Sequence, residues 1–306
     1  MSKNVYLVWL EWPEKCFRVD PQALSWLESA VPRGSEVVRA KSRRAFFAAL
    51  GRATHVITWY FDREWYSKAP KLKVLATPSA GRELLPHPPP PGVEIHHGHF
   101  HGDIMAEAVA AFMLAWCHGF FERMKYAPSS WPRTELSDRC RNLAGSRAVV
   151  VGYGNVGKAV GRKLKSLGVS VAGFRRRNIA GLYDALGDAD WLVMVLPCDT
   201  GTDDFLDRQL LSRLPRKCVV VNIGRGNSVD EDALVEALSE GRIAGAYLDV
   251  IKNEPSSGDD PSRGILSRLD GGKDWEKNLV LMPHSSAFAP DYLLKCFREL
   301  KDDGCI

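Results

Sequence analysis

Short apolar runs alternate along the chain with longer segments whose apolar residues recur every three or four positions. The short runs are rich in β-branched residues and predict strands, and the longer segments predict helices that cover a parallel sheet. The strands expected in the first third are 5–10, 36–40, 55–60, 72–78 and 93–97, with helices over 21–31 and 42–50. The strands expected in a second series are 147–152, 169–174, 191–197, 218–224, 244–250 and 278–284. This pattern predicts an α/β protein with two parallel sheets.

A long apolar segment, 104–121, separates the two series and includes Glu107 and His118. Those polar residues favour a buried helix over a membrane span. We expect the carboxylate of Asp103 to cap the first turn of this helix. The segment is apolar nearly all round, so we expect it to be covered on more than one side. We place the domain change near residue 102.

A glycine-rich turn follows the first strand of the second series. Gly152, Gly154 and Gly157 lie in the spacing of a dinucleotide fingerprint, with a strand before them and a helix after them. The first glycine permits a tight turn, the second lets the backbone approach a pyrophosphate, and the third lets helix and strand pack closely. The amides of Asn155 and Val156 are then expected to face the phosphates.

Arginines stand where such a fingerprint usually has an acid. Arg175, Arg176 and Arg177 follow the next strand, at the place of the carboxylate that binds the ribose hydroxyls. A guanidinium cannot accept those hydrogen bonds, but it pairs well with a 2′-phosphate. We therefore expect NADP(H) to be preferred over NAD(H), with Arg175 and Arg176 as the main phosphate contacts. The alternative is a solvated basic turn.

Polar or glycine-rich groups follow almost every strand of the second series. In strand order they are Gly154, Arg175, Pro197 with Thr200 and Thr202, Arg225, Asp249 with Glu254, and His284. Ligands bind at the carboxyl edge of an open parallel sheet, so one crevice is expected to collect these groups.

Three of these residues suit the reduction of a carbonyl by a nicotinamide cofactor. Arg225 can hold a substrate carboxylate and polarise the neighbouring carbonyl, because its guanidinium is forked and always charged. His284 can donate the proton, and Glu254 can accept the other ring N–H and favour the imidazolium form. Each residue alone also fits a structural role, as a surface arginine, a capping glutamate or a core histidine. Their joint placement on one sheet edge favours catalysis.

With these motifs the chain resembles the D-isomer-specific 2-hydroxyacid dehydrogenases, which include glyoxylate/hydroxypyruvate reductases and phosphoglycerate dehydrogenase. The most specific block is VVVNIGRGNSVDEDALVEALSEGRIAGAYLDVIKNEP, residues 219–255. The other matching motifs are LAGSRAVVVGYGNVGKAVGRKLKSLG, LPCDTGT, MPHSSA, LKVLATPSAG and MAEAVAAFMLA. The resemblance covers roughly residues 55–300.

The resemblance implies two Rossmann-like or flavodoxin-like domains with an active-site cleft between them. The chain's end would return to the first domain, giving a substrate-binding domain over 1–101 plus 286–306 and a dinucleotide-binding domain over 102–285. A homodimer is implied, with the helix after Asp103 in the subunit contact. The loop over 255–278, which includes SSGDD, looks longer than is usual in the family.

The resemblance also implies the site residues. Arg225, Glu254 and His284 form the catalytic set, and backbone amides near Ala80 and Gly81 hold the substrate carboxylate. From the sequence itself, Trp59 and Tyr60 fall at a strand end of the first series that should face the crevice, so they line the substrate pocket, or one of them packs in the core. The implied cofactor contacts are Asn155, Val156, Pro197, Thr202, Ile223 and Asp249.

We therefore expect an NADPH-preferring reductase of a small 2-oxo acid such as glyoxylate or hydroxypyruvate, forming the D-2-hydroxy acid. One rival is a nucleotide-sensing scaffold like the C-terminal-binding-protein corepressors, which resemble the same family. Another is a dehydrogenase of the formate or phosphite type.

Composition changes this interpretation little. The net charge of +4 in 306 residues is too weak to indicate a nucleic-acid partner. The opening residues do not resemble a signal peptide, and the seven cysteines are dispersed and odd in number, which favours reduced thiols and a cytoplasmic location.

A run of histidines precedes the long helix. His96, His97, His99 and His101 lie within IHHGHFHGD, and alternate residues of an extended segment share one face. No carboxylate or thiolate set lies nearby in the sequence, so no metal site is expected. His101 is a candidate substrate contact.

Overall fold

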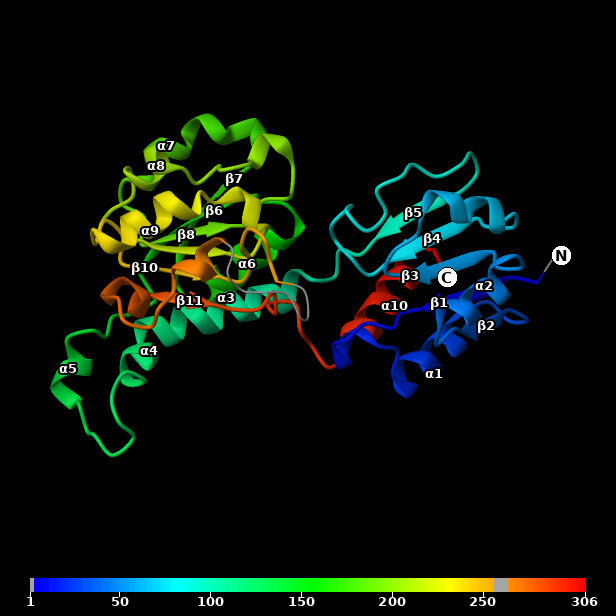
Figure 1. Ribbon diagram of the computed structural model, residues 1–306, viewed down its shortest axis with the longest axis horizontal. Helices are drawn as coiled ribbons and strands as arrows, with labels where there is room; N and C mark the ends of the chain where they lie inside the picture. Colours follow the sequence, from blue (N-terminus) through cyan, green and yellow to red (C-terminus); the bar gives the residue numbers. More distant parts are fainter. Residues whose placement is uncertain (1–2, 256–263) are drawn as a thin grey trace. The chain divides into compact units, whose positions relative to one another are not determined.

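The computed structural model describes residues 3–255 and 264–306, and the chain forms two compact units (Figure 1). Unit 1 comprises Met1–His101 and Phe288–Ile306, and unit 2 comprises Gly102–Ala287. Each unit has its own parallel sheet and its own core.

Among the described residues, unit 1 contains a five-stranded parallel sheet in the order β2-β1-β3-β4-β5. Its strands are β1 Val5–Trp9, β2 Glu36–Arg39, β3 His55–Thr58, β4 Val74–Thr77 and β5 Glu94–His97. Its helices are α1 Pro21–Ala30, α2 Arg43–Leu50 and α10 Tyr292–Asp302, with the 3-10 helices η1 Lys15–Phe17 and η2 Arg63–Lys68. The side chain of Asp20 accepts the amides of Gln22 and Ala23, which explains where α1 begins.

The C-terminal helix α10 belongs to the core of unit 1. One face of α10 carries Leu293, Cys296, Phe297 and Leu300, all of them buried. This face is apolar and the opposite face is charged, so burial against unit 1 stabilises the helix. Residues from both ends of the chain therefore complete one domain.

Among the described residues, unit 2 contains a six-stranded parallel sheet in the order β11-β10-β9-β8-β6-β7. Its strands are β6 Arg147–Val151, β7 Ser170–Phe174, β8 Trp191–Met194, β9 Val219–Asn222, β10 Gly245–Leu248 and β11 Leu279–Leu281. Its α-helices are α3 Gly102–Cys117, α4 Phe120–Arg123, α5 Arg133–Ser137, α6 Asn155–Ser166, α7 Leu182–Leu186, α8 Arg208–Leu211 and α9 Glu231–Ser239. Its 3-10 helices are η3 Arg176–Gly181, η4 Thr200–Thr202, η5 Gly226–Ser228, η6 Gly264–Arg268 and η7 Asp274–Asn278. The central strands are buried on both faces, as expected from their continuous apolar runs.

The long helix α3 packs against α6, and a Cβ on Gly102 would lie 2.9 Å from the side chain of Ala159. Its buried residues include Val109, Phe112 and Met113, so it forms part of the core of unit 2. The expectation that Asp103 caps this helix is wrong, because α3 already begins at Gly102 and places Asp103 inside the first turn. In residues 3–255 and 264–306, no helix is long and apolar enough to cross a membrane.

All eleven strands expected from the sequence are present, and each begins within two residues of its expected start. Several strands end before the apolar run that predicted them ends. The residues Pro197, Gly224 and His284 lie beyond the strands β8, β9 and β11, in the loops that leave the sheet. These loops carry the candidate chemistry.

Candidate active site

The loops at the carboxyl edge of the unit 2 sheet are pressed together. A Cβ on Gly224, after β9, would lie 2.6 Å from the backbone of Leu196, after β8. A Cβ on Gly226 would lie 2.0 Å from the backbone of Ile251, after β10. Real Cβ atoms do not approach a backbone so closely, so only glycine fits these positions. Arg225 therefore lies on a loop that packs against the loop after β8 on one side and the loop after β10 on the other.

Hydrogen bonds fix the backbone of Arg225. Its carbonyl accepts the side-chain N–H of Asn222 at 3.1 Å and the hydroxyl of Ser228 at 2.7 Å. Asn222 is fully buried, so it is a rigid anchor for this turn. The guanidinium donates from Nη1 to the carbonyl of Gly224 at 2.9 Å and remains partly exposed.

The two other candidate catalytic residues contact each other directly. Nδ1 of His284 and Oε2 of Glu254 lie 2.9 Å apart, and the two side chains are 47% and 39% exposed. The hydrogen bond to Glu254 raises the pKa of His284 above its ordinary value, although partial burial opposes the change. The positive charge of Arg225 lowers the pKa of His284, so the guanidinium and the imidazole interact electrostatically.

Asp249 holds the turn that carries His284. Its buried carboxylate accepts the amide of Ser285 at 2.9 Å and that of Ser286 at 3.0 Å. Its backbone carbonyl accepts the amide of His284 at 2.8 Å. His284 itself has a positive φ of 52°, which is uncommon outside glycine. The aspartate thus fixes the histidine in a conformation that the backbone alone would not favour.

Glu231 has a similar role, which its place in the sequence does not indicate. Its buried carboxylate accepts the amide of Lys252 at 2.7 Å and that of Ile265 at 2.8 Å. It thereby fixes both ends of the segment that contains Glu254. Acidic residues are frequent in the first turn of a helix, so the sequence carried no signal that this one is buried.

A pocket of about 260 Å³ adjoins the His284–Glu254 pair. The residues that line it are Asp249, Ile251, Glu254, Pro255, Leu266, Leu281, Met282, Pro283 and His284. The candidate catalytic pair therefore borders a mostly apolar hollow. The SSGDD motif of the long loop lies outside the described residues.

The fingerprint glycines meet the needs of a phosphate-binding turn. Gly152 has a φ of +88°, and a Cβ on it would lie 2.2 Å from the carbonyl oxygen of Val195. A Cβ on Gly157 would lie 2.4 Å from the carbonyl oxygen of Gly152, whereas Gly154 faces open space. The helix α6 begins at Asn155, and no described side chain caps its first turn. This helix N-terminus fits an anionic phosphate.

The arginines after β7 lie beside this turn. The Nε of Arg175 donates to the carbonyl of Tyr153, within the fingerprint. Its own amide donates to the side chain of Asn178 at 2.7 Å. Arg176 is 86% exposed and pairs with Asp199 at 3.5 Å. A cationic group therefore follows β7, where a ribose-binding carboxylate stands in other fingerprints.

The remaining candidate cofactor contacts lie in the loops after β8 and β9. The hydroxyl of Thr202 donates to the carbonyl of Pro197 at 2.7 Å and accepts the amide of Asp199 at 3.2 Å. Thr202 thus shapes the loop after β8. The side chain of Ile223 lies in the core, so only its backbone is available to a ligand.

The sequence of residues 110–286 matches the family model for the NAD-binding domain of D-isomer specific 2-hydroxyacid dehydrogenases. The chain belongs to this family. It is 27% identical to a glyoxylate reductase of Thermococcus kodakarensis over 251 residues, 73% of this chain and 69% of the relative. It is 30% identical to a glyoxylate/hydroxypyruvate reductase A of Arabidopsis thaliana over 195 residues, 60% of this chain and 58% of the relative.

Solved structures share the fold over nearly the whole chain. An NADPH-dependent glyoxylate/hydroxypyruvate reductase of Sinorhizobium meliloti, in complex with NADP and sulfate, superposes with a TM-score of 0.73 at 23% identity. That match covers 99% of this chain and 96% of the other. A 2-hydroxyacid dehydrogenase of Lactobacillus delbrueckii in an NAD complex gives a TM-score of 0.75 at 17% identity, with coverages of 99% and 96%. The protein is an NAD(P)-dependent 2-hydroxyacid dehydrogenase.

The candidate substrate residues of this 2-hydroxyacid dehydrogenase lie in unit 1. Trp59 is buried, and its ring contacts those of Trp12 and Phe17. Tyr60 is half-buried against Trp9. Both residues thus take part in packing, whatever else they do.

Two further unit 1 sites were singled out from the sequence. Ala80 and Gly81 follow β4, in a loop where the hydroxyl of Ser79 donates to the carbonyl of Gly81 at 3.3 Å. His101 is buried, and its Nε2 lies 2.8 Å from the hydroxyl of Tyr292 on α10. That contact gives His101 a packing role in unit 1.

Proposed function

We propose that this 2-hydroxyacid dehydrogenase uses NADPH to reduce a small 2-oxo acid of the glyoxylate or hydroxypyruvate kind to the D-2-hydroxy acid. The observation that carries the proposal is the 2.9 Å contact between His284 and Glu254, within the electrostatic reach of Arg225. A proton donor, its orienting carboxylate and a fixed cation are the groups that carbonyl reduction requires.

Each residue has a distinct role in this mechanism. When bound, the reduced nicotinamide supplies the hydride. Arg225 binds the substrate carboxylate and polarises the neighbouring carbonyl. His284 donates a proton from Nε2 to the carbonyl oxygen, because Nδ1 faces Glu254. Glu254 orients the ring and favours its protonated form.

The substrate class is supported by the names of relatives. The relatives from Thermococcus kodakarensis and Arabidopsis thaliana are called glyoxylate reductase and glyoxylate/hydroxypyruvate reductase. A panel of 2-oxo acids with NADPH, followed at about 340 nm where the reduced nicotinamide absorbs, tests the proposal. Turnover is expected to be greatest with glyoxylate or hydroxypyruvate. Tight cofactor binding without turnover of any acid would instead favour the corepressor-like scaffold.

We propose NADPH preference from the basic groups after β7. A guanidinium anchored to the fingerprint turn through Tyr153 is well placed to pair with a 2′-phosphate. Arg175→Ala is expected to raise the KM for NADPH about tenfold or more and to leave the KM for NADH nearly unchanged. Arg177→Ala, in an exposed neighbour, serves as the control. A wild-type enzyme that prefers NADH would contradict the assignment.

The proton-donor role of His284 has its own test. His284→Ala is expected to lower turnover about a hundredfold or more, because the general acid is lost. The KM for the cofactor is expected to change little. Retained turnover would remove His284 from the mechanism.

We also propose a homodimer that covers an apolar surface of unit 2. Phe120, Met124 and Trp131, which follow α3, are 62%, 79% and 89% exposed. Exposed side chains of this size mark an association surface when they occur together. Light scattering is expected to give twice the chain mass, and Trp131→Glu is expected to shift the distribution to monomer. A wild-type monomer at micromolar concentration would contradict the proposal.

A further inference from the structure

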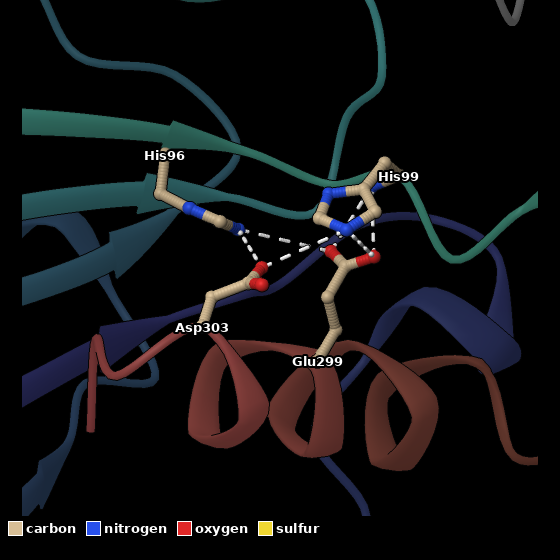
Figure 2. Close-up of side chains that lie close together, drawn as sticks. All are labelled: His96, His99, Glu299 and Asp303. Atoms are coloured by element: carbon tan, nitrogen blue, oxygen red, sulfur yellow. Dashed lines mark hydrogen bonds and ion pairs between the residues drawn. The ribbon is translucent and has the colours of Figure 1, made fainter. Parts of the chain in front are cut away.

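Four side chains from distant parts of the sequence meet in unit 1. His96 lies on β5 and His99 two residues beyond it, whereas Glu299 and Asp303 lie one turn apart at the end of α10. Figure 2 shows both imidazoles pointing toward the two carboxylates. The carboxylates of this cluster are thus supplied by the C-terminal segment and not by the neighbouring sequence.

The contacts between these groups run from each histidine to both acids. Nε2 of His96 lies 3.1 Å from Oδ2 of Asp303 and 3.8 Å from Oε1 of Glu299. Nε2 of His99 lies 3.3 Å from Oε2 of Glu299 and 3.7 Å from Oδ2 of Asp303. One ligand atom from each residue can be chosen so that all four lie within 4.8 Å of one another.

These separations match the edges of a small coordination tetrahedron. Zinc binds imidazole nitrogen and carboxylate oxygen at about 2.0–2.2 Å, so ligand atoms around a tetrahedral ion lie about 3.3–3.6 Å apart. The four nitrogen-to-oxygen separations, from 3.1 to 3.8 Å, bracket that value, and each histidine faces a different oxygen of Glu299. With one ligand atom from each residue the set lies within 4.8 Å, so an ion would draw its most distant members together by about 1 Å.

The surroundings of the cluster also suit a cation. The side chain of Glu299 is only 8% exposed, and its carboxylate accepts the backbone amide of His99 at 3.0 and 3.1 Å. Asp303 places a second negative charge beside it. Nε2 of His96 is shielded from water, and no described group makes a well-aligned hydrogen bond to it. Two adjoining carboxylates in a partly buried site need positive charge, which an ion supplies with two neutral imidazole ligands.

We propose that His96, His99, Glu299 and Asp303 bind one Zn²⁺ ion, which fastens the C-terminal helix α10 to β5. Two nitrogen and two oxygen donors suit zinc better than Mg²⁺ or Ca²⁺, which take oxygen ligands. Four protein ligands fill a tetrahedron and leave no open position, so the ion has a structural and not a catalytic role. The site joins residues about two hundred positions apart in the sequence.

The alternative is a pair of histidine–carboxylate ion pairs that need no metal. Isothermal titration calorimetry at neutral pH distinguishes a zinc site from metal-free ion pairs. It uses the full chain without a histidine tag, after dialysis against EDTA. Zinc chloride is expected to bind with one ion per chain at the tightest site. At free zinc a hundredfold above the Kd, the unfolding midpoint is expected to rise by about 5 °C. Lack of such binding would overturn the proposal.

Two matched pairs of variants locate the ion. Asp303→Asn and His99→Asn each remove one ligand and are expected to weaken zinc binding at least about tenfold. The controls are Asp302→Asn, an exposed neighbour, and His87→Gln, an exposed histidine of the same unit, and both are expected to bind zinc normally. Equal binding by Asp303→Asn and Asp302→Asn would place the ion elsewhere and overturn the proposal.

A spectroscopic readout tests the geometry independently of affinity. Co²⁺ in place of zinc is expected to show the strong visible absorption of a four-coordinate ion, and Asp303→Asn is expected to weaken it. The faint absorption of six-coordinate Co²⁺ in the wild-type protein would refute a closed tetrahedral site. Because none of these measurements involves turnover, their outcome does not depend on the proposed reductase activity.

Discussion

Replacement of Glu254 by glutamine tests how this chain tunes its proton donor. The substitution keeps the size of the side chain and an oxygen that can accept from Nδ1 of His284. It removes the negative charge that lies 2.9 Å from the ring. The variant therefore isolates the electrostatic effect of the carboxylate from its steric effect.

The expected loss follows from the strength and exposure of the contact. A hydrogen bond to a charged group contributes about 1.5–3 kcal/mol. The two side chains are 47% and 39% exposed, so water screens the pair and the lower end of that range applies. A loss of about 1.4 kcal/mol corresponds to a tenfold change, so kcat/KM for reduction at neutral pH is expected to fall about tenfold.

The pH profile gives a second and sharper readout. Glu254 raises the pKa of His284, and reduction requires the protonated ring, so activity falls as the pH rises through that pKa. Without the carboxylate, this fall is expected at lower pH. Oxidation of the hydroxy acid requires the neutral ring, so its activity is expected to extend to lower pH in the variant. Measurements of kcat/KM in both directions between about pH 5 and 9 record both changes.

A matched control lies on the loop after β8 and contacts the loop that carries Glu254. Asp204→Asn removes a comparably exposed carboxylate that pairs with Lys252, two residues before Glu254. It is expected to leave both limbs of the pH profile in place. If Glu254→Gln lost less than about twofold and its limbs coincided with those of the wild type, the carboxylate would have no part in tuning His284.

Three further substitutions test the scaffold of the site and of unit 1. Gly226→Ala is expected to lower the free energy of unfolding in urea by about 1–3 kcal/mol and to reduce turnover, because the added Cβ would lie 2.0 Å from the backbone of Ile251. An unchanged urea midpoint would contradict that close approach. Glu231→Gln leaves one of the two backbone amides without an acceptor and is expected to lower kcat and stability. The control Glu236→Gln, at a side chain 42% exposed on the same helix, is expected to change neither. Burial lowers the pKa of His55 from 6.5 to about 4, so its neutral form stabilises the fold above pH 6.5 and this contribution is lost as the pH falls toward 4. The unfolding free energy of both proteins is therefore expected to fall between pH 7 and pH 4.5, but that of His55→Asn by about 2 kcal/mol less than that of the wild type. Equal losses would show that the pKa of His55 is not lowered.

The sequence predicted most of the secondary structure because the strands are apolar and short and the turns between them are rich in glycine and polar residues. It also predicted that Arg225, Glu254 and His284 follow strands of the same sheet. Parallel strands bring their carboxyl ends to one edge, and this topological rule needs no knowledge of side-chain contacts.

The sequence could not predict contacts that depend on burial or on pairing between distant segments. Glu231 looks like an ordinary acidic residue and Asp249 was expected only as a cofactor contact, but each is buried and holds two backbone amides. The carboxylates that meet His96 and His99 are not the nearby Glu94 or Asp103, because they lie on or beside a helix about two hundred positions later. Such pairs are fixed by how α10 packs, and a local pattern carries no information about it.

The return of the chain into unit 1 has a consequence for synthesis. The first 101 residues cannot cover their apolar face until α10 leaves the ribosome, whereas unit 2 is continuous and already complete by then. At about 5–20 residues per second, translation of the intervening segment takes roughly 10–40 s. During that interval the nascent N-terminal third exposes the surface that Phe297 and Leu300 later bury, so chaperones have a defined period in which to bind it.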